Sequence, residues 1–221
     1  MNIKNRCLFI YNTVSCLLWI CVLYVSLEYA LYKEKRPITK FWGQHKNLIA
    51  ITQSLSIFDV LFSLFGFIKS DIKIVMTQIF SRFFIVHLIF NYLPNNNKWI
   101  LSCLIPWAII DIIRYLIYSL NLLNIRIGIL TSLRNKLPLI LYPIGIVSEV
   151  VCTLTSLKNI QSTPFLRSFP YAMPNNLNFQ IDIYYFCIFI LFLYIPGSIL
   201  VYTTAVRKSR GKTTTNEKKV N

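Results

Sequence analysis

A tyrosine and a glutamate interrupt the otherwise apolar segment 139–149, where Tyr142 precedes Glu149 by seven residues. A charged carboxylate at the centre of a membrane helix costs at least about 2 to 3 kcal/mol, so a glutamate in such a segment is by default a functional-site hypothesis. Seven residues are about two turns of an α-helix, which places both side chains on roughly one face, about 10 Å apart along the axis. A phenol and a carboxylic acid on one face could act as the acid and the base of a proton-transfer reaction.

The residues between this pair favour an irregular helix with room beside it. Pro143 has no amide hydrogen, so the carbonyl of Leu139 loses its usual partner and the helix is expected to kink or to start anew. Gly145 has no side chain and lets a ligand or another backbone come close. This pattern is typical of a pocket wall, although a kinked structural helix in which Glu149 pairs with an arginine fits the same residues.

The rest of the chain consists largely of long apolar segments that must position this pair. The 221 residues are 55% hydrophobic, with a mean hydropathy of +0.55, whereas soluble domains average about 45 to 50% apolar residues. A spanning helix needs about 20 apolar residues, and runs close to that length occupy 8–27, 48–68, 74–94, 98–120, 137–157 and 183–206. We therefore predict an all-α fold, an integral membrane bundle of six transmembrane helices.

The distribution of charge predicts the topology of this bundle. The formal net charge is +15, and placing the N-terminus in the cytosol puts the larger share of Lys and Arg on the cytosolic side, in agreement with the positive-inside rule. We expect the first apolar run to be an uncleaved helix rather than a signal peptide, because it is long and has no small-x-small cleavage site. Segment 1–206 is predicted to be one domain, and 207–221, rich in Lys, Thr and Asn, a disordered basic cytosolic tail.

Other ionisable side chains lie within the apolar runs and should pair with one another in the bundle interior. Asp111 and Arg114 are three residues apart, which lets them pair on one helix face, with Tyr115 and Tyr118 beside it. Arg114 also lies toward the cytosolic end of its helix, where it could meet an anionic ligand. The remaining side chains of this kind are predicted to make interhelical or structural contacts: Asp59, Arg82 and His87.

Several function classes do not fit the sequence. The six cysteines form no C-x-x-C pair and no metal-ligand spacing, so no metal site is expected. A thiolate phosphatase needs an arginine six residues after its cysteine, and the residues at that spacing are Thr13, Val22, Leu27, Ile109, Lys158 and Leu193. The basic residues fall mainly in loops and tails without an aromatic-basic surface module, so we expect no nucleic-acid binding.

Short strings occur in a fixed order between residue 11 and about residue 150. They are Tyr11-Asn12; Gly66-Phe67-Ile68-Lys69-Ser70 with Gln78 and Ser81-Arg82; Trp107 with Asp111-Ile112-Ile113-Arg114-Tyr115 and Tyr118; Leu130-Thr131 with Leu133-Arg134; and Leu141-Tyr142-Pro143-Ile144-Gly145 with Glu149. The ordered set resembles the membrane-bound 3-hydroxyacyl-CoA dehydratases of very-long-chain fatty-acid elongation, once called protein-tyrosine-phosphatase-like proteins.

The resemblance implies a fold, a site and a compartment. In that family the tyrosine and glutamate of the Tyr-Pro-x-Gly-x-x-x-Glu motif are taken as catalytic, and they correspond to Tyr142 and Glu149. It also implies six helices, both termini in the cytosol and residence in the endoplasmic reticulum membrane. The chain departs from the family's usual residues at positions that bear on chain preference and pocket detail more than on the reaction: Asp59, Phe62, Asp111, Ser132 and Asn135.

The implied reaction removes water from a 3-hydroxyacyl-CoA to give a trans-2-enoyl-CoA. An enzyme with this activity is a hydro-lyase, and we expect it to need no metal or redox cofactor. From ordinary pKa values of about 4.3 for Glu and about 10 for Tyr, we assign Glu149 as the base and Tyr142 as the proton donor or carbonyl partner, with the reverse assignment open. The acyl chain is expected between helices and the CoA phosphates at the cytosolic face. The residues expected to bind substrate are Arg114, Tyr115, Tyr118, Arg126, Arg134, Lys136 and Gly145.

The expected partners are the long-chain 3-hydroxyacyl-CoA substrate, the lipid bilayer and the other elongation enzymes, namely the elongase, the ketoacyl-CoA reductase and the enoyl-CoA reductase. Lys218 and Lys219 stand fourth and third from the carboxyl end and resemble a dilysine retrieval signal of endoplasmic reticulum membrane proteins. The alternative is a non-catalytic membrane scaffold of the elongation complex or a small transporter. A transporter usually shows related halves or paired broken helices, and neither is visible in the sequence.

Overall fold

The computed structural model describes residues 2–32, 37–67, 71–94, 97–163, 176 and 180–210. Within these ranges every regular element longer than one residue is a helix, and six stretches are long and apolar enough to cross a membrane. The elements in chain order are α1 (Ile3–Tyr32), α2 (Ile38–Leu55), α3 (Ile57–Leu64), α4 (Ile72–His87), the 3-10 helix η1 (Ile89–Tyr92), α5 (Trp99–Leu122), α6 (Gly128–Lys136), α7 (Pro138–Gln161) and α8 (Ile183–Ser209). The protein is therefore an all-α, multi-pass membrane bundle, as the apolar runs predict.

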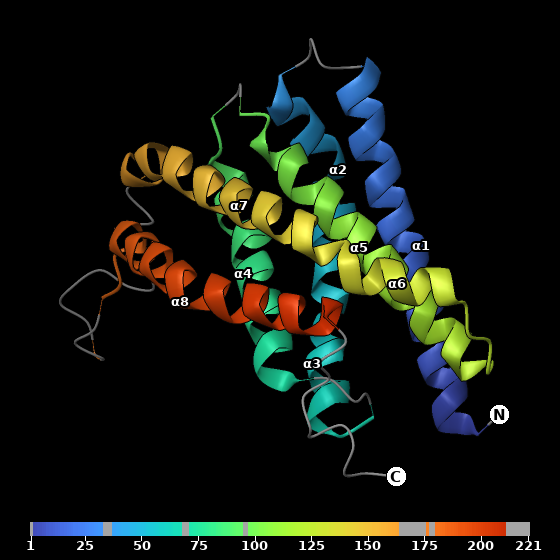
Figure 1. Cartoon of the computed structure of the whole chain (residues 1–221). Helices are drawn as coiled ribbons and strands as arrows, with labels where there is room; N and C mark the ends of the chain where they lie inside the picture. The colour runs from blue at the N-terminus through green and yellow to red at the C-terminus, as the bar shows by residue number, and fades with distance from the viewer. Residues whose placement is uncertain are drawn as a thin grey trace.

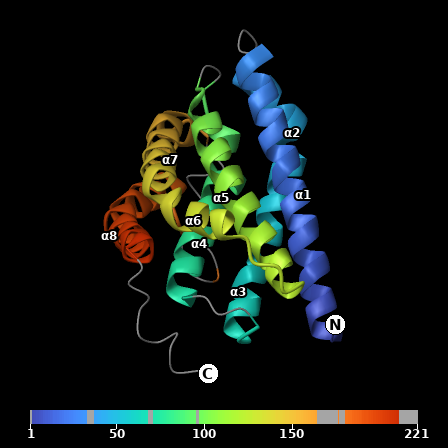
Figure 2. The ribbon, with the colours of Figure 1, turned by 45° about the vertical axis from the view of Figure 1, so that its right-hand side comes forward.

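Helix α5 lies at the centre of the bundle and contacts the helices on both sides of it. It packs against α1 on one side and against α7 on the other, and α7 in turn packs against α8. Figures 1 and 2 show α1 and α2 along one edge, α7 and α8 side by side along the opposite edge, and α4 and α5 between them. Accordingly, α5 is the most buried of the six spans and α8 is the least buried.

Large apolar side chains face outward on the outer helices. On α1, Ile10, Leu17 and Tyr24 are exposed at intervals of seven residues and mark one continuous face. On another face of the same helix, Trp19 is buried in the core. A soluble monomer rarely exposes so large an apolar surface, so this outward face of α1 is suited to contact with lipid.

The structure corrects the bounds predicted for the second span. Helix α2 begins at Ile38, before the apolar run 48–68, and Pro37 holds an extended conformation at its N-cap with no amide that needs a partner. The run 48–68 is itself divided at Ser56 into α2 and α3. Between the fourth and fifth apolar runs, the chain forms the short helix α6.

Two helices extend beyond the predicted apolar runs. Helix α7 continues past the run 137–157 to Gln161, and residues 164–175 and 177–179 lie outside the described part of the chain. Helix α8 continues to Ser209, with Arg207 and Lys208 in its last turn, where cations interact favourably with the helix dipole. The first residues of the predicted tail are therefore helical, and residues 211–221 lie outside the described part of the chain.

Helix α7 does not start anew at Pro143, contrary to one of the two predicted outcomes. It runs from Pro138 to Gln161 with Pro143 inside it, since membrane helices tolerate a proline when neighbouring groups satisfy the freed backbone carbonyl. Tyr142 and Glu149 consequently lie on one uninterrupted helix, and the periodicity that places them on one face holds.

Candidate active site

A cavity of about 420 Å³ lies between α4, α5, α7 and α8. Tyr142 and Glu149 of α7 both line it. The other helices contribute Arg82 from α4, Trp107 from α5 and Tyr194 from α8. Four helices that are far apart in the sequence thus meet around the predicted pair.

The Glu149 carboxylate is buried and is held at both of its oxygens. Trp107 Nε1 donates a hydrogen bond to Oε1 at 3.0 Å, and the Tyr194 hydroxyl donates to Oε2 at 2.7 Å. An ionised carboxylate can accept about four hydrogen bonds, so these two donors leave acceptor capacity free. These two close hydrogen bonds come from a phenol and an indole rather than from the arginine of the alternative prediction, and Ser81 of α4 also lies beside the carboxylate.

The Tyr142 side chain is half-buried and lines the same cavity. Its hydroxyl makes no hydrogen bond to any residue in the described part of the chain. Tyr194 differs in this respect, because its hydroxyl is bonded to Glu149. A phenol with an unused donor on a cavity wall is available to a ligand.

Gly145 provides the surface on which the Trp107 side chain rests. A Cβ atom at position 145 would lie 3.6 Å from Trp107 Nε1, in ordinary van der Waals contact. The indole therefore packs on the bare backbone of α7, beside the Glu149 carboxylate to which it donates. The group that lies against Gly145 is thus a side chain of α5.

Part of the cavity wall is apolar and reaches the outer surface of the bundle. Met76 and Phe80 of α4 and Leu193 of α8 line the cavity and are also exposed. Gly197 of α8 and Thr77 of α4 lie where these two helices meet. A Cβ atom on Gly197 would be 3.5 Å from Thr77 Cγ2. An apolar chain in the cavity could therefore pass between α4 and α8 toward lipid.

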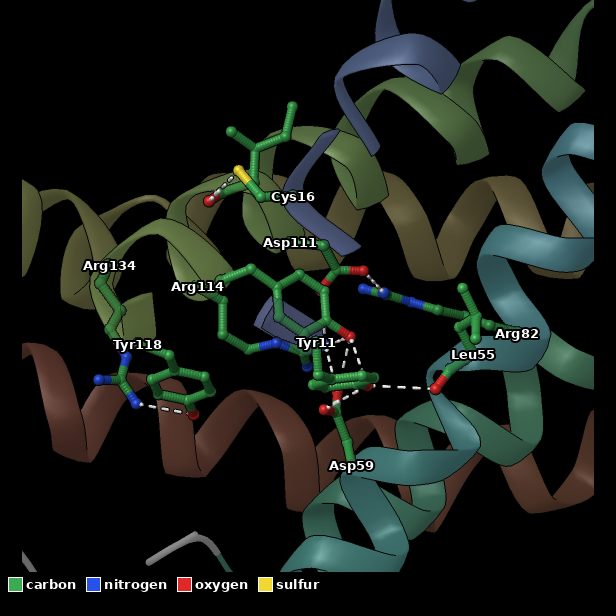
Figure 3. Close-up of polar contacts among 11 residues, drawn as sticks. Tyr11, Cys16, Leu55, Asp59, Arg82, Asp111, Arg114, Tyr118 and Arg134 are labelled. Atoms are coloured by element: carbon green, nitrogen blue, oxygen red, sulfur yellow. Dashed lines mark hydrogen bonds and ion pairs between the residues drawn. The ribbon is translucent and has the colours of Figure 1, made fainter. Parts of the chain in front are cut away.

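A second buried carboxylate, that of Asp59, lies in a polar cluster away from the cavity wall (Figure 3). Asp59 accepts hydrogen bonds from the Tyr11 and Tyr115 hydroxyls, both at 2.8 Å, and from Arg114 Nη2 at 2.7 Å. These donors come from α1 and α5, so the carboxylate on α3 joins three helices. We refer to Tyr11, Asp59, Asp111, Arg114 and Tyr115 as the Asp59 cluster.

Asp111 connects the Asp59 cluster to the cavity. Its carboxylate oxygens lie 3.3 Å from Arg114 Nη2 and 2.6 Å from Arg82 Nη1. The predicted pairing of Asp111 with Arg114 is confirmed, as are the predicted interhelical contacts of Asp59 and Arg82. Arg82 also lines the cavity, where its guanidinium lies 5.3 Å from the centre of the Trp107 ring.

The residues predicted to bind substrate fall in several places. Arg114 and Tyr115 belong to the Asp59 cluster rather than to the cavity wall. Tyr118 and Arg134 contact each other away from that cluster, with 3.3 Å between Arg134 Nη2 and the Tyr118 hydroxyl (Figure 3). Gly145 lies on the cavity wall. Two more are exposed at the surface: Arg126 and Lys136.

The sequence alone does not indicate the two donors that bind Glu149. Trp107 stands among the strings that carry the resemblance, but nothing local to it indicates a bond to a residue 42 positions away. Tyr194 stands two residues before a Pro-Gly pair in an apolar run, much as Tyr142 stands before a proline and a glycine. That repeated arrangement is the signal that could have identified it.

Comparison with known proteins defines the class of this bundle. Residues 53–215 match the family described as protein tyrosine phosphatase-like protein, PTPLA. The chain belongs to this family. No solved structure matches the chain.

Three relatives are named for the same enzymatic activity. A probable very-long-chain (3R)-3-hydroxyacyl-CoA dehydratase of Schizosaccharomyces pombe is 34% identical over 70% of this chain and 74% of its own length. The dehydratase PASTICCINO 2 of Arabidopsis thaliana is 31% identical over 90% of this chain and 89% of its own length. Very-long-chain (3R)-3-hydroxyacyl-CoA dehydratase 2 of Homo sapiens is 28% identical over 92% of this chain and 79% of its own length. Dehydratases of this kind are hydro-lyases.

Proposed function

We propose that this protein is a hydro-lyase that converts long-chain (3R)-3-hydroxyacyl-CoA to trans-2-enoyl-CoA in very-long-chain fatty-acid elongation, with Tyr142 and Glu149 as its acid and base. The observation that supports it most is that both side chains line one cavity, where Glu149 has two donors and the Tyr142 hydroxyl is unused by the described residues. The names of the relatives from three organisms support the reaction itself.

The substrate is proposed to lie with its CoA at the end of the cavity nearer Tyr142. This residue is close to the start of α7, and the preceding helix α6 contacts both α7 and α8. Guanidinium and ammonium groups bind phosphate through charge-assisted hydrogen bonds. Basic residues at this end of the bundle include Arg126, Arg134, Lys136, Arg207 and Lys208.

The acyl chain is proposed to run in the opposite direction, along the apolar wall. Met76, Phe80 and Leu193 offer it hydrocarbon contact and are exposed at the outer surface. A long chain can therefore extend between α4 and α8 into the bilayer, so the cavity itself need not enclose it. Arg114 and Tyr115 are assigned a supporting role through the Asp59 cluster rather than direct contact with the substrate.

The separation of the pair along α7 suits a substrate placed between them. Seven residues span about 10 Å of helix, which is too long for a direct hydrogen bond. Helical side chains lean toward the N-terminus, so Glu149 is directed toward Tyr142. The thioester and the reacting carbons occupy the intervening space in this arrangement.

In the proposed reaction Tyr142 is the acid, in that it donates a hydrogen bond to the thioester carbonyl, whose oxygen gains negative charge as C2 loses its proton. Glu149 takes that proton, the electrons left on C2 form the C2–C3 double bond, and the C3–O bond breaks. The proton on Glu149 then passes to the departing hydroxide, which leaves as water. Protons balance, and both side chains return to their starting states.

We also propose that the protein resides in the endoplasmic reticulum membrane with both termini in the cytosol. A 3-hydroxyacyl-CoA is the product of ketoacyl-CoA reduction, and an enoyl-CoA is the substrate of enoyl-CoA reduction, so the elongase and the two reductases are the proposed partners. The six helices long and apolar enough to cross a membrane support a membrane location.

Incubation of the purified protein with a long-chain (3R)-3-hydroxyacyl-CoA, followed by mass spectrometry for the enoyl product, tests the proposal. We expect turnover by the wild-type protein. Tyr142→Phe and Glu149→Gln should each lower kcat by about 10²- to 10⁴-fold, the usual contribution of a general acid or base. Tyr185→Phe is the matched control, because this tyrosine is exposed on α8 and should be dispensable.

The outcomes separate the competing classes. Folded wild-type protein that forms no enoyl product would refute the dehydratase and leave the non-catalytic scaffold or the transporter. Turnover by the wild-type protein together with full activity of Tyr142→Phe or Glu149→Gln would keep the reaction and refute the assigned pair.

A further inference from the structure

We infer that Tyr194 is a positioning residue of the site, whose hydroxyl holds the Glu149 carboxylate in the orientation that removes the C2 proton. The inference rests on the proposed function and deepens it. It concerns a residue on the last helix, 45 positions from Glu149 and outside the motif that contains Tyr142.

The bond between Tyr194 and Glu149 is short, and the carboxylate that accepts it is buried. The two oxygens are 2.7 Å apart, a distance typical of strong O–H···O hydrogen bonds. Glu149 is only 5% exposed, and a hydrogen bond is electrostatically stronger in such a low-dielectric site than in water. The contact therefore has enough strength to determine where the carboxylate points.

The two donors to Glu149 act on different oxygens from different helices. Trp107 reaches Oε1 from α5, and Tyr194 reaches Oε2 from α8. A planar carboxylate that is fixed at both oxygens cannot rotate freely about its last carbon–carbon bond. The direction of its free lone pairs is thereby set before substrate binds, which removes reorganisation from the proton-transfer step.

The packing of α8 fixes the position of the Tyr194 hydroxyl. Three residues further along, Gly197 of α8 faces Thr77 of α4, and α8 packs against both α4 and α7. Tyr194 is therefore anchored from two neighbouring helices. The position of its hydroxyl beside Glu149 is therefore determined by the packing of α8 and not by the conformation of α7 alone.

The two cavity tyrosines accordingly differ in what their hydroxyl groups can do. The Tyr142 hydroxyl is unused by the described residues and is free to meet the thioester. The Tyr194 hydroxyl is already committed to Glu149. Tyr194 thus acts through the base, and its removal should slow proton transfer more than it weakens substrate binding.

Tyr194→Phe tests this inference, because it removes the hydroxyl and keeps the ring that packs between the helices. We expect kcat per folded protein to fall roughly 10- to 100-fold, as the loss of a hydrogen bond to a charged group predicts. KM should change by less than about threefold. With substrate deuterated at C2, the primary isotope effect on kcat should increase, because proton transfer to Glu149 then limits turnover more strongly.

Two controls distinguish positioning from packing. Tyr202→Phe removes an exposed hydroxyl from the same helix and should leave kcat unchanged. In a Glu149→Asp background, the shortened side chain no longer meets the Tyr194 hydroxyl in the same place. Adding Tyr194→Phe to that background should therefore have less than about a threefold effect, because the two changes act on one contact.

The outcomes of these experiments distinguish the inference from the proposed function. Wild-type kcat per folded protein in Tyr194→Phe, while Glu149→Gln is inactive, would overturn the inference and leave the proposed function in place. A raised KM with unchanged kcat, or equal losses in the wild-type and Glu149→Asp backgrounds, would assign Tyr194 to packing and would also overturn it. If folded wild-type protein forms no enoyl product, the proposed function fails and the inference fails with it.

Discussion

Two regions of this bundle contain a buried carboxylate bonded to tyrosine, and they differ in what surrounds it. In the Asp59 cluster the carboxylate accepts from two phenols and from the guanidinium of Arg114, which neutralises it directly. At the cavity, Glu149 accepts from two neutral donors and lies beside about 420 Å³ of open space. The first carboxylate is enclosed by its partners, whereas the second keeps acceptor capacity next to a cavity.

The difference shows that residue types alone do not distinguish a reactive carboxylate from a structural one. Both regions combine tyrosine with an acidic residue inside the membrane span, and both satisfy the need of a buried polar group for hydrogen bonds. What separates them is an unused phenol and room for a substrate, which only the cavity provides. Arg82 lies between the two regions, since it lines the cavity and pairs with Asp111.

The largest effect that would test this contrast is expected from Asp59→Ala. Removing one partner of a buried ion pair leaves the other charge uncompensated and costs about 3 to 5 kcal/mol. We therefore expect a large fall in the free energy of unfolding, measured by denaturant titration in micelles, with kcat per folded protein changed less than about twofold.

Asp71→Ala is the matched control for Asp59→Ala. Asp71 is an exposed N-cap residue of α4 whose carboxylate accepts from the Lys73 amide, and losing such a cap costs about 1 kcal/mol. A tenfold or greater loss of kcat in Asp59→Ala would show that the cluster takes part in catalysis, and the contrast between the two regions would fail.

An intermediate effect is expected from Trp107→Phe, which removes one of the two donors to Glu149 and keeps an aromatic ring in the core. We expect kcat to fall by about tenfold, in line with the loss of one hydrogen bond to a charged group, while thermal stability changes little. Trp42→Phe is the control, because this indole donates to Asn91 at 3.0 Å, away from the cavity. Equal activity of the two variants would show that the Trp107 indole does not contribute to the reaction.

The smallest effect is expected from Tyr11→Phe. It deletes one of the three donors to Asp59 and should lower the free energy of unfolding by about 1 kcal/mol without changing kcat. Tyr24→Phe removes an exposed hydroxyl from the same helix and should change neither quantity. A loss of activity in Tyr11→Phe that exceeds its loss of stability would connect the Asp59 cluster to the reaction.

Features that depend only on residues close to one another in the sequence were predictable from the sequence. The six spans follow from continuous apolar runs, and the pairing of Asp111 with Arg114 follows from a spacing of three residues on one helix. At Pro143 the same local reasoning left two outcomes open, a kink or a new start, and the helix does not start anew. The consequence of a proline depends on whether packing satisfies the freed carbonyl, which the local sequence does not reveal.

The positions of Arg114 and Tyr115 could not be predicted from residues close in the sequence. Their place near the end of α5 was compatible with an anionic ligand, yet both point to Asp59, more than 50 residues earlier in the chain. Membrane helices are apolar on most of their surface, so hydrophobic periodicity gives little indication of which neighbour a given face contacts. Partners from distant helices therefore could not be assigned.

Read alone, the order of residues was sufficient to establish a six-span helical bundle and to put Tyr142 and Glu149 on one face of α7, because both properties arise within single helices. Folding added the remaining parts of the site: the donors Trp107 and Tyr194, the cavity they share with Glu149, and the separation of that cavity from the Asp59 cluster. These features require side chains from α4, α5, α7 and α8 to meet. Contacts of this kind depend on how the helices pack against one another, and local sequence patterns do not predict that packing.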